Sequence, residues 1–173
     1  MIRMNRTMTT GVLAIGFFLG LGQAQSQAPV SPSQQEKVVT THASGNFDVK
    51  LAPETLADKG ADKTLARMSI DKQFHGDLEA TSKGEMLSAV TPVKGSAGYV
   101  AMERVTGTLK GRKGSFVLQH SATMARGRPH LNVVVVPDSG TDELTGLAGR
   151  MTINVAAGGQ HSYDFEYTFA DTP

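Results

Sequence analysis

Apolar and polar residues alternate along most of the chain after residue 45. The segment NFDVKL places Phe47, Val49 and Leu51 on one side and charged residues on the other, and HSYDFEYTF near the end of the chain repeats the pattern with aromatic residues. Such alternation is typical of a β-strand with one buried face. It predicts strands at residues 46–51, 67–76, 77–90, 96–107, 115–124, 130–136, 146–155 and 161–169.

The strands are expected to close on themselves. No segment in this region repeats its apolar residues with the 3.6-residue period of a helix, so nothing is predicted to cover an open sheet. Turn-forming runs such as PDSGTDE separate the strands, as in an antiparallel meander. Closure removes both the exposed edges and the exposed apolar face. We therefore predict an all-β fold, a single closed antiparallel barrel of roughly eight strands and of the lipocalin kind, with a β-sandwich as the alternative that periodicity does not separate.

The first two dozen residues differ from the rest. Arg3 and Arg6 occur there without any acidic residue, and an uncharged apolar run of 11 residues, GVLAIGFFLGL, is followed by small residues. A basic start, a short apolar middle and a small-residue end are typical of a secretory signal peptide. The run is shorter than the roughly 20 residues that span a bilayer. Cleavage fits after Ala24, and nearly as well after Ala28, so we expect export to the periplasm or the cell exterior.

The strand pattern and the N-terminal pattern together predict the boundaries of three segments, and the charge of the chain limits the partners that it can bind. The boundaries are a signal peptide at 1–24, a flexible lead-in at 25–42 and a barrel domain at 43–170. The chain has 17 basic and 16 acidic residues, and without Arg3 and Arg6 its formal charge is −1. That balance gives no support to a nucleic-acid or anionic-membrane partner. With no cysteine in the sequence, stability must come from the core and the sheet.

Several motifs that often bind cofactors or metals are missing. The glycine-rich runs TGTLKGRKG and TGLAGRM are followed by predicted strands, whereas a phosphate-binding loop leads into a helix. The five histidines lack the spacing of metal-binding pairs, and zinc frameworks built on cysteine are excluded. The basic runs KGRK and ARGR follow successive strands and so belong to opposite barrel ends, which splits any nucleic-acid patch. We predict no metal and no cofactor.

Four longer runs carry a family resemblance. They are MSIDKQFHGDLEATSKGEML, GSAGYVAMERVTGTLKGRKGSFVLQHSATM, VVPDSGTDELTGLAGRMTI and HSYDFEYTF. Through them the chain resembles a bacterial family of small proteins that is defined as a domain of unknown function. The resemblance implies a barrel similar to that of allene oxide cyclase. No motif matches the catalytic residues of those cyclases, so none is carried over.

Three ionisable residues interrupt apolar strand faces. Lys72 is in register with Met68, Ile70 and Phe74 on the strand at 67–76. Glu103 and His120 lie in the same way on the apolar faces of the strands at 96–107 and 115–124. If the apolar sides face inward, these three groups share one interior, and burying a charge without a partner is costly. Counting from a turn centred near Arg112 places Glu103 and His120 opposite each other, within one bulge of register.

This interior leads to three hypotheses. The barrel binds a small, mostly apolar molecule; or it is an isomerase or cyclase that uses Glu103 and His120 as its catalytic pair for proton transfer; or it is a structural or partner-binding protein with a filled core. A structural hydrogen bond between Glu103 and His120 also accounts for their burial, and it is the favoured interpretation of the pair. The candidate ligand-binding residues are Lys72, Phe74, Tyr99, Leu118 and Phe165.

Overall fold

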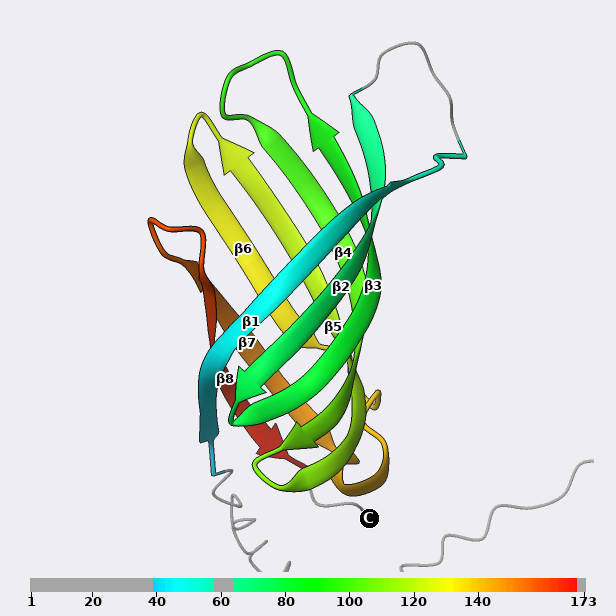
Figure 1. The fold of residues 1–173 in the computed structure, drawn as a ribbon, viewed down its shortest axis with the longest axis vertical. Helices are drawn as coiled ribbons and strands as arrows, with labels where there is room; N and C mark the ends of the chain where they lie inside the picture. The colour runs from blue at the N-terminus through cyan, green and yellow to red at the C-terminus, as the bar shows by residue number, and fades with distance from the viewer. Residues whose placement is uncertain (1–38, 58–63, 171–173) are drawn as a thin grey trace, which may run out of the picture. The chain divides into compact units, whose positions relative to one another are not determined.

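The computed structural model describes residues 39–57 and 64–170, which contain one antiparallel β-barrel (Figure 1). The strands are β1 (Thr41–Glu54), β2 (Leu65–Gly76), β3 (Leu78–Val90), β4 (Ala97–Leu109), β5 (Arg112–Ala125), β6 (Arg128–Val135), β7 (Leu147–Val155) and β8 (His161–Phe169). The only helical element among the described residues is the short 3₁₀ turn η1 (Asp142–Leu144). The predicted signal peptide and nearly all of the predicted lead-in lie outside the described residues.

Each strand pairs with the next one along the chain, and β1 closes the barrel by pairing with β8 (Figure 1). The closed eight-stranded barrel confirms the predicted fold class, and the sandwich alternative is wrong. The pairing between β6 and β7 is the shortest in the barrel, since only Val134 and Arg150 pair there. Alternating residues of every strand therefore face a common interior.

The two ends of the barrel differ. At one end lie the turns between β2 and β3, between β4 and β5, and between β6 and β7, and we call it the closed end. The β4–β5 turn consists of Lys110 and Gly111, with φ angles of 45° and 85°, as a two-residue hairpin turn requires. The opposite end, which we call the open end, carries the β3–β4, β5–β6 and β7–β8 turns. The basic runs around Lys110 and Arg126 thus lie at opposite ends, as expected.

Aromatic and aliphatic side chains fill the closed half of the barrel. Phe74, Phe116 and Phe165 are at most 1% exposed. The Phe116 and Phe165 rings stack with their centroids 5.8 Å apart, and Phe74 meets Tyr163 edge to ring at 5.7 Å. Burying each phenylalanine stabilises the fold by roughly 2–3 kcal/mol. This packed half forms a fixed base beneath the polar residues described next.

Candidate functional site

A buried polar cluster lies at the level where the packed half of the barrel ends. It consists of Lys72 on β2, Ser82 on β3, Glu103 on β4 and His120 on β5, and each is at most 6% exposed. Lys72 Nζ lies 2.7 Å from Glu103 Oε2, and His120 Nε2 lies 2.9 Å from the same oxygen. The Ser82 hydroxyl donates a short hydrogen bond to the other carboxylate oxygen, Oε1. One carboxylate on β4 therefore contacts side chains of its two neighbours, β3 and β5, and of β2 beyond β3.

The strand register explains how Glu103 meets His120. Glu103 pairs with Leu118, and His120 pairs with Ala101, so the two polar residues are diagonal neighbours on the inner face. Counting residues from a turn centred near Arg112 predicts that Glu103 and His120 lie opposite each other. The turn is in fact centred between Lys110 and Gly111. Diagonal neighbours on one sheet face remain within reach of long side chains. The contact forms, although the expected pairing is displaced by two residues.

A glycine makes room for the Glu103 strand. Gly84 on β3 pairs with Glu103, and a Cβ atom built on Gly84 would lie 2.4 Å from the Met102 carbonyl oxygen and 2.8 Å from Glu103 Cα. Both are backbone atoms, which have no freedom to move aside. The missing side chain lets β3 and β4 approach closely at this height, as expected for strongly coiled strands of a small barrel.

The Glu103 carboxylate is ionised across the physiological pH range. Burial by itself raises the pKa of Glu103 and is the largest single influence. The contact with His120, the charge and hydrogen bond of Lys72 and the hydrogen bond from Ser82 act in the opposite direction and together outweigh it. They lower the pKa of Glu103 from 4.5 to about 2. The cluster thus keeps a negative charge inside the barrel.

His120 retains unused hydrogen-bonding capacity. Its Nε2 is within 2.9 Å of Glu103 Oε2, yet it makes no hydrogen bond of acceptable angle and is the only enclosed side-chain polar atom of the described residues without one. The distance therefore reports a close electrostatic contact rather than an aligned bond. The charge of Glu103 still acts on the ring at this distance.

Above the cluster, the barrel interior opens into a cavity of about 560 Å³. All eight strands contribute to its lining. The floor includes Phe47, Ile70, Lys72 and His120, which are 3–6% exposed, whereas the rim includes Leu51, Leu131 and Val155, which are 37–62% exposed. Lys72 Nζ lies 4.9 Å from the centre of the Phe47 ring. The cavity is thus largely apolar, with a cation and an imidazole at its inner end.

The structure separates the candidate residues by height along the barrel. Lys72 and Tyr99 line the cavity together with His120. Burial, and secondarily the negative charge of Glu103, raise the pKa of Tyr99. Phe74, Leu118 and Phe165 belong instead to the packed core of the closed half, and none of them lines the cavity. Glu103 lies behind Lys72 and His120 and is fully buried.

Sequence reasoning missed several cavity residues. The sequence places Phe47 and Ile70 on apolar strand faces without marking them as cavity residues, and its pattern singles out neither Leu131 nor His161. Their alternation was visible, but their height along the barrel depends on strand stagger. Ser82 was missed because it lies in the weakest alternating segment, although it has the same parity as the buried Ala80.

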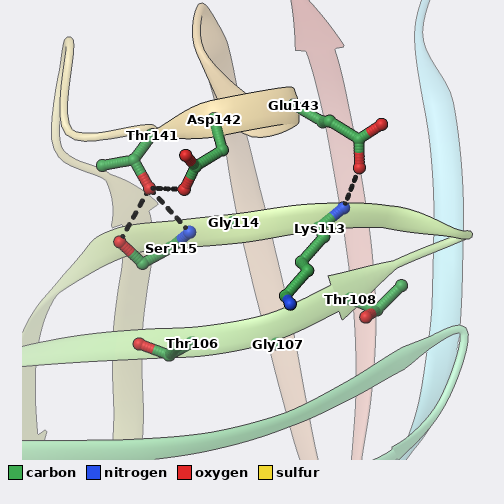
Figure 2. A pocket seen from close by; sticks show the side chains of 9 residues that line it. All are labelled: Thr106, Gly107, Thr108, Lys113, Gly114, Ser115, Thr141, Asp142 and Glu143. Atoms are coloured by element: carbon green, nitrogen blue, oxygen red, sulfur yellow. Dashed lines mark hydrogen bonds between the residues drawn. The ribbon is translucent and has the colours of Figure 1, made fainter.

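A second hollow lies on the outer surface near the closed end (Figure 2). It is lined by residues of the TGTLKGRKG run, by Ser115 on β5, and by Thr141, Asp142 and Glu143, where the loop after β6 enters η1. Figure 2 shows the Thr141 hydroxyl in contact with both Ser115 and Asp142, while Glu143 accepts a hydrogen bond from the Lys113 backbone N–H. These polar groups bind one another and attach the loop to β5.

Comparison with known proteins identifies the family. A family model described as a protein of unknown function, DUF3224, matches residues 43–167. The chain belongs to the DUF3224 family. The fold is similar to the crystal structure, at 1.84 Å resolution, of a DUF3224 protein of unknown function from Shewanella oneidensis MR-1, with 53% sequence identity and a TM-score of 0.74, over 78% of this chain and 100% of that one. No curated protein matches the chain significantly.

Two further findings describe the molecule. Within residues 39–57 and 64–170, no helix has the length and apolar character needed to cross a membrane. Across the same residues, no group of three or more histidine or carboxylate side chains is close enough to hold a metal ion.

Proposed function

We propose that this DUF3224 barrel binds one small, mostly apolar molecule in the cavity at its open end. The observation that carries the proposal is the division of the interior into a packed half and an open half, with Lys72 and His120 at the boundary. A volume of about 560 Å³ lies within the range of small-molecule pockets. An apolar wall with a few polar groups at one end is typical of such pockets.

The other two hypotheses receive less support. A completely filled core is disfavoured by the cavity, since only the closed half is packed. Direct proton transfer by Glu103 is disfavoured, because its carboxylate lies outside the cavity lining and its pKa of about 2 makes it a weak base at neutral pH. Lys72 and His120 are the polar groups that a bound molecule would contact.

The first test uses the protein purified from its own host. Native mass spectrometry is expected to show a co-purifying small molecule, which organic extraction removes. A second test measures binding of the apolar fluorescent dye anilinonaphthalene sulfonate to the extracted protein. Ile153→Trp places an indole in the cavity and should weaken dye binding at least tenfold.

The matched control is Val100→Trp, because Val100 is 55% exposed and does not line the interior cavity. It should leave dye binding unchanged. Equal affinity of the wild type and both variants would place the dye outside the cavity. If the host protein also carried no molecule, the binding function would be refuted.

We also propose that the protein is exported before it acts. The supporting observation is the basic, apolar and small-residue order of the first two dozen residues. N-terminal sequencing of protein recovered from the periplasm or culture medium of its own host should give a start between Gln25 and Pro29. Recovery with Met1 intact would refute export by cleavage.

A further inference from the structure

The Glu103 carboxylate determines which nitrogen of the His120 ring carries the proton. Nε2 lies 2.9 Å from Glu103 Oε2. The two atoms are not aligned for a hydrogen bond, but at this distance the negative oxygen attracts the positive hydrogen of an N–H and repels a lone pair on Nε2. In the neutral ring the proton therefore resides on Nε2, and Nδ1 carries the lone pair.

That lone pair is accessible from the cavity. His120 lines the cavity, and Nε2 is the enclosed nitrogen on the Glu103 side. No described residue donates a hydrogen bond to Nδ1. The inner end of the cavity thus presents a basic nitrogen whose opposite side is held by a permanent negative charge. A histidine that is held by a carboxylate at one ring nitrogen can act as a general base through the other.

Lys72 supplies the complementary donor. Its Nζ has three N–H groups, and one of them serves Glu103 Oε2. No other hydrogen bond within the described residues uses the ammonium, which lies 4.9 Å and 5.6 Å from the ring centres of Phe47 and Phe74. The free N–H groups can donate to a ligand oxygen, because Lys72 also lines the cavity.

We infer that the cavity floor catalyses a proton shift within a bound, neutral ketone that carries a carbon–carbon double bond between its β- and γ-carbons. The inference rests on the proposed binding function. Nδ1 of His120 removes a proton from the carbon next to the carbonyl, the C–H electron pair forms the enolate C=C bond, and the carbonyl π pair moves onto the oxygen. Lys72 donates a hydrogen bond to the enolate oxygen. The same proton then returns from Nδ1 to another carbon of the conjugated system, so the ketone isomerises and no oxidant, reductant or other reactant is needed.

The surrounding charges favour a neutral substrate. The Lys72 ammonium and the Glu103 carboxylate already neutralise each other. A carboxylate placed against Lys72 and His120 would lie close to Glu103 Oε2, which both of these groups already contact, and would be repelled. The other polar side chains of the lining include Tyr99 and His161. Neither brings a fixed positive charge comparable to that of Lys72.

The arrangement of His120 is tested on the wild-type protein by nitrogen-15 NMR. The Nδ1 resonance should have the shift of an unprotonated ring nitrogen, and Nε2 that of a protonated one. Glu103→Gln should weaken the preference of the ring proton for Nε2 over Nδ1. A merely structural role of Glu103 does not predict this change. Protonation of Nδ1 in the neutral wild-type ring would overturn the inference without affecting ligand binding.

The activity is tested with cyclohex-3-enone, whose conversion to the conjugated ketone cyclohex-2-enone is followed by ultraviolet absorbance. Binding of the same ketone is measured in parallel by NMR line broadening. His120→Gln should lower the rate about 10²–10⁴-fold, as expected for loss of a general base. Gln119→Ala changes the exposed neighbour on the same strand and should leave the rate unchanged.

The outcomes separate the two proposals. Binding together with a rate that depends on His120 supports both of them. Binding with a rate no higher than that of His120→Gln overturns the catalytic inference and leaves the binding function in place. Absence of binding by this ketone and by the fluorescent dye overturns both.

Discussion

Removing the Glu103 carboxylate should destabilise the barrel strongly, and removing its partner as well should restore stability. Glu103→Leu leaves the Lys72 ammonium, which is 6% exposed, without its counter-ion, and leaves Ser82 and His120 without their shared partner. Breaking a buried ion pair by removing one member costs about 3–5 kcal/mol. Lys72→Met should cost a similar amount, because it leaves the carboxylate without its cation.

The pKa of Glu103 leads to a similar magnitude. A reduction from 4.5 to about 2 means that the folded protein favours the ionised carboxylate by about 3 kcal/mol relative to the unfolded chain. The double variant Lys72→Met/Glu103→Leu removes both charges and fills their space with apolar atoms. Replacing a buried ion pair in this way is often neutral or stabilising. We expect the double variant to lose less than about 2 kcal/mol, well below the sum of the single losses.

The measurement is the free energy of unfolding in urea at neutral pH for the wild type, both single variants and the double variant. Arg104→Ala is the control, since Arg104 is an exposed neighbour of Glu103 on β4, and it should change stability by no more than about 0.5 kcal/mol. Losses at Lys72 and Glu103 that simply add would mean that the two side chains do not stabilise each other. The description of the cluster would then be refuted.

Three further predictions concern acid, close packing and the core. The pKa of Glu103 is lowered, so ionised Glu103 stabilises the wild type by about 3 kcal/mol above pH 4.5, and this contribution should be lost as pH falls from about 4.5 to about 2. The double variant has no carboxylate at this position and should not show this loss. Parallel pH profiles of the urea midpoints of the two proteins would contradict the prediction. Gly84→Ala should lower the thermal midpoint, whereas Gly158→Ala, with open space around the added Cβ, should not; equal midpoints would argue against close strand approach. Phe165→Ala should cost about 3–5 kcal/mol in urea unfolding, and a loss below 1 kcal/mol would contradict tight packing of the closed half.

The alternating pattern was sufficient to predict which side chains face the interior. A strand has a period of two, so knowing that Phe74 is buried also places Lys72 on the inner face, and the same reasoning holds for Glu103 beside Val105. Closure of the sheet then followed from the absence of helices to cover it. These inferences needed only local spacing, which the sequence contains.

Height along the barrel could not be obtained in the same way. Phe165 and Tyr99 both alternate correctly, yet one belongs to the packed half and the other lines the cavity. The difference depends on the stagger between strands, which the turns set and which a single sequence does not display. A turn centred near Arg112, with one bulge allowed, pairs Glu103 with His120, whereas the actual centre between Lys110 and Gly111 pairs it with Leu118.

The position of the cluster is itself informative about its role. A buried ion pair is weak evidence for stability, because apolar side chains of similar volume often serve the fold as well or better. Lys72 and Glu103 could both be replaced by residues like the adjacent Phe74 and Val105, which would extend the packed half upward. Their charges lie instead where packing stops and the cavity begins, and two of the contacts converge on one oxygen beneath His120. A stable double variant would therefore show that the fold does not require the charges of Lys72 and Glu103. The remaining effect of these charges would be to orient the His120 ring toward the cavity.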